Sequence, residues 1–135
     1  MSKDIYDIFE PHKPKGQKDL LIVDWAVGSM CNFSCTYCDP LFYEGKTPWH
    51  DIDDCTRFID FLWENVCVPQ KKILYFNIHA GEPTLWRDLD RFCEHVKSLD
   101  NNNQIMLLTN GTRNVKWWTS RNHLINNIHE SIVFY

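Results

Sequence analysis

The sequence has little of what marks a membrane-spanning, secreted or nucleic-acid-binding protein. No run approaches the roughly 18 consecutive apolar residues of a transmembrane helix, and the opening Met-Ser-Lys-Asp lacks an apolar signal region. The formal net charge is −4, so no overall positive field attracts nucleic acid. Six cysteines are present, but disulfides form in an oxidising compartment, and no feature of the sequence indicates secretion into one. We therefore expect a cytoplasmic protein with no membrane or nucleic-acid partner.

What the chain does have is an alternation of apolar runs and amphipathic stretches. The expected strands are 20–27, 73–78, 104–108 and 131–135, and the expected helices are 52–68, 85–99 and 115–126. The first helix has Asp51 as its N-cap and is expected to stop before Pro69. Strands that alternate with helices form right-handed βαβ units, so the predicted class is α/β with a parallel sheet.

The two ends of the chain differ from this pattern. Residues 1–19, with three prolines or glycines among charges, predict an irregular arm or a short helix at 5–9, leaving 20–135 as the core domain. The apolar strand expected at 131–135 would expose a bare edge. We therefore expect a chain truncated at its C-terminus, or an edge covered by a partner or a second copy.

Three of the six cysteines fall within eight residues, directly after the first expected strand. Cys31, Cys35 and Cys38 have the spacing Cys-x3-Cys-x2-Cys, and sulfurs this close can share one metal centre. They can also be ordinary buried thiols. A structural zinc requires a fourth ligand, for which His50 and Cys55 are the nearest candidates.

An iron–sulfur cluster is the remaining interpretation of the three thiols. An electron-transfer cluster takes four cysteines, and the fourth would have to come from Cys55, Cys67 or Cys93. A cluster held by only three cysteines leaves one iron open to a substrate or a cofactor. The pattern then favours chemistry over electron storage.

With Tyr37 just before the last cysteine, the motif resembles the signature of the radical S-adenosylmethionine (radical SAM) enzymes. The resemblance implies that Cys31, Cys35 and Cys38 bind a [4Fe-4S] cluster and that Tyr37 lies near the adenine of S-adenosylmethionine. In this family the reduced cluster cleaves the bound cofactor, and the resulting 5′-deoxyadenosyl radical abstracts hydrogen from a substrate.

Two later turns extend the resemblance. Ala80-Gly81-Glu82-Pro83, after the second expected strand, resembles the family's Gly-Gly-Glu-Pro motif, which contacts the amino group of the cofactor; here Ala80 replaces the first glycine. The turn with Asn110, after the third strand, resembles that of members that modify peptides. In parallel sheets the loops after the strands meet at one edge, so we expect all three loops to form one site.

The family resemblance also implies a fold and partners. The fold would be a partial parallel barrel, covering roughly the first three and a half units of the family's (βα)6 core. The implied partners are an electron donor such as flavodoxin or ferredoxin and a small-molecule or peptide substrate.

Overall fold

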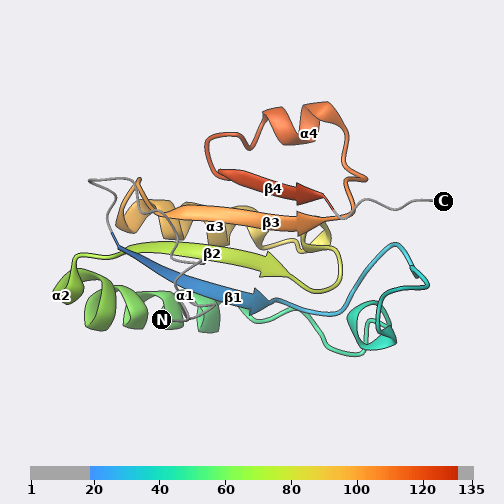
Figure 1. Ribbon diagram of the computed structural model, residues 1–135, viewed down its shortest axis with the longest axis horizontal. Helices are drawn as coiled ribbons and strands as arrows, with labels where there is room; N and C mark the ends of the chain where they lie inside the picture. The colour runs from blue at the N-terminus through green and yellow to red at the C-terminus, as the bar shows by residue number, and fades with distance from the viewer. Residues whose placement is uncertain (1–18, 131–135) are drawn as a thin grey trace, which may run out of the picture.

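The computed structural model describes residues 19–130, which contain one four-stranded parallel sheet. The strands are β1 (Leu20–Ala26), β2 (Ile73–His79), β3 (Gln104–Thr109) and β4 (Asn127–Glu130), in that order. All three neighbouring pairs are parallel, so the arrowheads point the same way in Figure 1. The first three strands match the predicted apolar runs within one residue at each end. The predicted α/β class and parallel sheet are confirmed.

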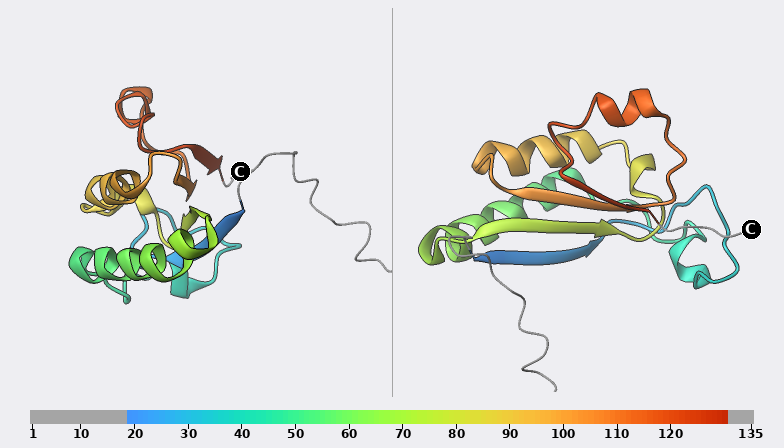
Figure 2. Two further views of the ribbon diagram at one scale, coloured as in Figure 1. Left: turned by 90° about the vertical axis from the view of Figure 1, so that its left-hand side faces the viewer. Right: turned by 45° about the horizontal axis from the view of Figure 1, so that its top comes forward.

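Two helices, α1 (Ile52–Leu62) and α3 (Leu89–Leu99), cover one face of this sheet (Figure 2). Alternate strand residues point toward the helices, and on β2 these are the fully buried Leu74, Phe76 and Ile78. The other face of the sheet is more open, with Ile22 57% exposed. In the part of the chain described, no helix has the length and apolarity needed to cross a membrane.

The start of α1 follows the prediction, but its end does not. The Asp51 carboxylate accepts the backbone N–H groups of Asp53 and Asp54, as expected of an N-cap. Instead of stopping at Pro69, the chain continues through a π-helical turn (Trp63–Cys67) into the short helix α2 (Val68–Gln70). Proline fits there because a first helical turn needs no N–H donor.

Three further boundaries correct the prediction. Helix α3 begins at Leu89 rather than 85, because Pro83–Leu85 form a separate 3-10 turn. Helix α4 is only Val115–Thr119, and the chain then turns into β4, whose sequence is too polar to be recognised as a strand. The strand predicted at 131–135 and the arm and short helix predicted before residue 19 lie outside the described residues.

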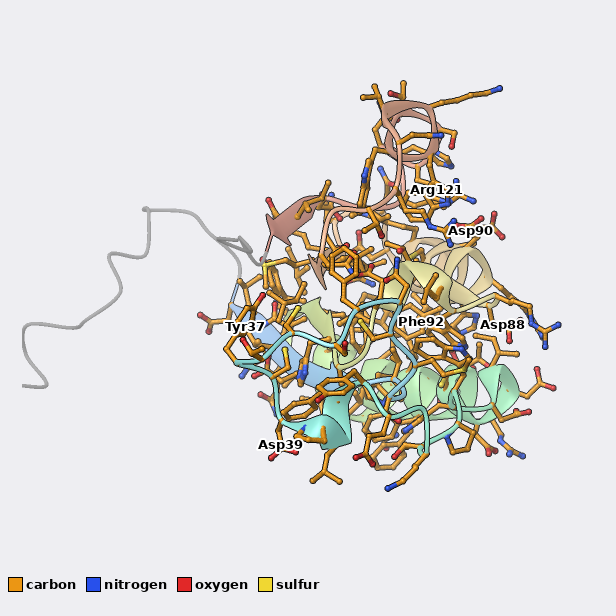
Figure 3. All side chains as sticks on the ribbon, turned by 90° about the vertical axis from the view of Figure 1, so that its right-hand side faces the viewer. Tyr37, Asp39, Asp88, Asp90, Phe92 and Arg121 are labelled. Carbon is orange, nitrogen blue, oxygen red and sulfur yellow. The ribbon has the colours of Figure 1, made fainter. Side chains whose placement is uncertain are left out.

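The segment after α4 is fixed to α3 by a two-point ion pair. Arg121 Nε and Nη2 donate to the two carboxylate oxygens of Asp90 at 2.7 and 2.8 Å, and both residues are labelled in Figure 3. The same guanidinium lies 4.1 Å from the ring centroid of Trp117. This bidentate geometry holds α4 and the approach to β4 against the helical layer.

Candidate cofactor site

The loops that follow β1, β2 and β3 meet at the carboxyl edge of the sheet, the edge that faces the viewer in Figure 3. They enclose a cavity of about 300 Å³. Among its lining residues are nearly all of the predicted site residues: Cys31, Cys35, Tyr37, Cys38, Ala80, Gly81, Glu82 and Asn110. Pro83 is buried and begins the 3-10 turn behind the cavity.

The cysteine loop is closed at its base by backbone pairing. Ser29 N–H donates to Thr47 O at 3.1 Å, and Thr47 N–H donates to Ser29 Oγ at 2.8 Å. Met30 and Glu44 form an isolated antiparallel bridge. Because both strands of this base are fixed, the three cysteines between them are held over the end of β1 although they belong to no helix or strand.

The three thiols are half-buried and close enough to influence one another. Desolvation raises the pKa of Cys38, and the neighbouring Cys35 and Cys31 raise it further. Thiolates that repel one another are stabilised by a shared positively charged centre, and a cluster of several irons, in which each thiolate binds a different iron, suits this donor set. Phe33 N–H lies 3.4 Å from Cys31 Sγ, which supplies one backbone hydrogen bond to a ligand sulfur.

The Ala80-Gly81 turn places the loop after β2 directly against the cysteine loop. Both residues have left-handed backbones, with φ of 69° at Ala80 and 59° at Gly81. A Cβ atom on Gly81 would lie 2.4 Å from Met30 O, closer than any side chain tolerates. Glycine at 81 is therefore required twice, by φ and by this contact.

Glu82 joins three loops through its backbone and its carboxylate. Its N–H donates to Met30 O at 2.8 Å, in the loop after β1. Its side chain, 1% exposed, accepts Thr84 Oγ1 and Thr109 Oγ1 at Oε1, both at 2.7 Å, and Asn110 N–H at Oε2, also at 2.7 Å. A buried carboxylate with this many donors fixes the relative positions of the loops.

A closed ring of side-chain hydrogen bonds links the cysteine loop to the loop after β3. Asn110 Nδ2 donates to Asn32 Oδ1 at 2.8 Å, and Asn32 Nδ2 donates to Thr112 Oγ1 at 3.2 Å. Thr112 Oγ1 in turn donates to Asn110 Oδ1 at 2.8 Å. Asn110 Nδ2 also lies 3.9 Å from Cys31 Sγ.

The side chains proposed as a fourth ligand lie elsewhere. The ring of His50 packs edge-on against Trp25, with centroids 6.1 Å apart, and does not line the cavity. Cys55, Cys67 and Cys93 are each 1% exposed, inside the hydrophobic core. Within residues 19–130, no three His, Cys, Asp or Glu side chains are grouped closely enough to hold a single metal ion.

Sequence reasoning missed the residues that connect the loops. Thr84 and Thr109 bind the Glu82 carboxylate, while Asn32 and Thr112 complete the ring around Asn110. The available signal was a polar residue at the end of an apolar strand, as with Thr109, which is 2% exposed. Such a residue must find a hydrogen-bond partner when it is buried.

Comparisons with known proteins identify the family of the chain. The family model of the Radical SAM superfamily matches residues 25–124. GTP 3',8-cyclase of Mannheimia succiniciproducens is 28% identical over 100 residues, covering 72% of this chain and 28% of that protein. GTP 3',8-cyclase of Tolumonas auensis is 32% identical over 90 residues, covering 65% of this chain and 25% of that protein. The chain thus spans about a quarter of the length of these relatives.

A solved structure has the same fold. The crystal structure of BtrN in complex with AdoMet and 2-DOIA aligns with a TM-score of 0.64 at 20% identity, over 87% of this chain and 49% of that one. Because the family model spans well over half of the chain and includes all three motif cysteines and both later turns, the chain belongs to the Radical SAM superfamily.

Proposed function

We propose that this chain binds a [4Fe-4S] cluster through Cys31, Cys35 and Cys38 and S-adenosylmethionine beside it, as the cofactor-binding part of a radical SAM enzyme. The observation that carries the proposal is the single cavity lined by the three thiols together with the Gly-Glu turn and Asn110. When bound, the two cofactors supply a 5′-deoxyadenosyl radical that abstracts hydrogen from a substrate, either a small molecule or a peptide.

Different residues of the chain would contact the cluster and S-adenosylmethionine. Phe33 and Tyr37 lie between the ligands and limit solvent access to the sulfurs, while Tyr37, 59% exposed, also offers an aromatic surface at the mouth of the cavity. The backbone of Ala80 and Gly81 lines the cavity without bulky side chains, which permits close approach by the methionine part of the cofactor. An external donor such as flavodoxin or ferredoxin would deliver the electron.

The test is anaerobic reconstitution of the full chain with iron and sulfide. We expect a brown protein with about four irons per chain, bleached by dithionite, whose reduced electron paramagnetic resonance (EPR) spectrum changes when S-adenosylmethionine is added. Alanine at any one of Cys31, Cys35 and Cys38 should abolish this cluster. Cys67→Ala is the matched control, since that thiol is buried in the core, and should retain it.

Two outcomes would contradict the proposal. A colourless protein that holds one tightly bound zinc would assign the thiols to a structural metal site. Loss of the cluster in Cys55→Ala, Cys67→Ala or Cys93→Ala, with iron-free but folded protein, would point to a four-cysteine electron carrier.

A further inference from the structure

We propose that Asn110 sets the reduction potential of the cluster by donating a hydrogen bond from its side-chain amide to the Cys31 sulfur. The inference rests on the proposed function, because it requires Cys31 to be a cluster ligand. It assigns Asn110 to the metal centre, through a ligand sulfur, rather than to S-adenosylmethionine. The observation that supports it is the 3.9 Å distance between Asn110 Nδ2 and Cys31 Sγ, two residues that are 79 positions apart in the sequence.

The orientation of the Asn110 amide is fixed by its partners. Its Oδ1 accepts the backbone N–H of Thr112 at 3.2 Å, and a backbone N–H can only donate. The oxygen must therefore face Thr112, and the NH2 group must face Asn32 Oδ1 and the Cys31 sulfur. The reversed amide would place its NH2 group against the backbone N–H of Thr112, and its oxygen against the side-chain Oδ1 of Asn32.

The amide is also held in place, so the contact does not depend on a freely rotating side chain. The Asn110 backbone N–H donates to the buried Glu82 carboxylate, and the side-chain Oδ1 of Asn110 also accepts the Thr112 hydroxyl. With both the backbone and the side chain fixed, the NH2 group stays beside the sulfur at no further ordering cost on reduction.

The direction of the effect follows from charge. One-electron reduction, with the electron taken from dithionite in a titration, breaks no bond and increases the negative charge on the cluster and its sulfurs. A fixed N–H donor therefore stabilises the reduced form more than the oxidised form and raises the potential. Removal of the donor should lower it.

The experiment is an EPR-monitored redox titration of the reconstituted full chain. Asn110→Ala should lower the midpoint by about 28 to 59 mV, a three- to tenfold change in the one-electron reduction constant. Asn110→Asp, which replaces the donor with an anion, should lower it further. Asn101→Ala is the matched control, since Asn101 is exposed in the loop that precedes β3, and should keep the wild-type midpoint.

A second substitution tests whether the potential depends on how the Asn110 amide is positioned. Thr112→Val removes the hydroxyl that bonds the Asn110 oxygen, on an exposed residue that is not part of the core. It should lower the midpoint in the wild-type chain and have a smaller effect in the Asn110→Ala background, because the part of its influence that passes through Asn110 is then already lost, while Asn32 Nδ2 still loses its acceptor. If Asn110→Ala fails to retain iron, Thr112→Val alone provides the test.

The outcomes distinguish this inference from the proposed function. If the wild-type chain forms no [4Fe-4S] cluster, the proposed function fails and the inference with it. If the cluster forms with full iron content and Asn110→Ala, Asn110→Asp and Thr112→Val all keep the wild-type midpoint, the inference alone is wrong.

Discussion

At the scale of single residues, Ala80 stands out because an alanine has a backbone conformation suited to glycine. The family motif that it resembles has glycine there, and φ at Ala80 is 69°. The left-handed region costs an L-residue about 1–2 kcal/mol, which glycine avoids. The neighbouring contacts of Gly81 with Met30 and of Glu82 with Asn110 keep the turn in this shape.

We expect Ala80→Gly to stabilise the protein. Relief of the left-handed strain, less glycine's greater loss of chain entropy of about 0.5–1 kcal/mol, should raise the free energy of unfolding by about 0.5–1 kcal/mol. Urea denaturation of the cluster-free protein measures the change. Ala26→Gly is the matched control, because Ala26 has the extended backbone of β1 and should lose stability. Equal effects of the two substitutions would contradict the interpretation.

At the scale of elements, the two ends of the sheet have different roles, one in forming the cavity and the other in joining a strand to a helix. The carboxyl edge carries the cavity, and the amino edge carries Asn103, a fully buried side chain in the connection between α3 and β3. Asn103 Oδ1 accepts Leu74 N–H from β2 at 3.0 Å, and Asn103 Nδ2 donates to Val96 O of α3 at 3.0 Å. One amide thus joins a strand to the helix that covers it.

Asn103→Ala should therefore destabilise the fold without changing the cofactor site. It leaves a buried N–H and a buried carbonyl unpaired, at about 1–3 kcal/mol each, so we expect the free energy of unfolding to fall by about 2–6 kcal/mol. Iron uptake at low temperature should match wild type. The exposed Asn101→Ala is the control and should change stability little. A loss of stability below about 0.5 kcal/mol, which is ordinary for a surface substitution, would show that Asn103 has no such role.

The elements also show which parts of the structure could be predicted from sequence. Strands β1 to β3 are predictable because short apolar runs bounded by turn residues favour strands, and the meeting of the three loops follows from the parallel order, but the runs do not reveal that one face of the sheet is more open. The end of α1 is not predictable from Pro69, because proline ends a helix when it is interior but also fits the first turn of a new one, as it does in α2. The links of Glu82 to Thr109 and of Asn32 to Thr112 were missed because they join loops whose separation is set by the fold.

At the scale of the whole molecule, the fold sorts six cysteines into two groups. Cys31, Cys35 and Cys38 are half-exposed around the cavity. The other three belong to the helical layer behind the sheet, and burial raises the pKa of Cys93 to about 12 and that of Cys55 to about 11. Part of this division is predictable from the sequence, because Cys55 falls on the apolar stripe of the helix expected at 52–68 and Cys93 lies beside that of the helix expected at 85–99, and both are buried in the structure.

This division predicts a pattern of chemical labelling. Thiolates react with iodoacetamide and buried thiols do not, so brief alkylation of the cluster-free native protein at about pH 8 should modify Cys31, Cys35 and Cys38 and leave Cys55, Cys67 and Cys93 unmodified. Peptide mass spectrometry reads each site, and labelling in guanidinium supplies the control in which all six react. Reconstitution with iron and sulfide before alkylation should protect the first group, because a thiolate bound to iron is no longer free to attack. Modification of Cys93 in the native protein at a rate near that of Cys31 would mean that the core opens far more readily than its packing implies. Protection of all six cysteines before any iron is added would mean that the loop thiols are not accessible at the cavity.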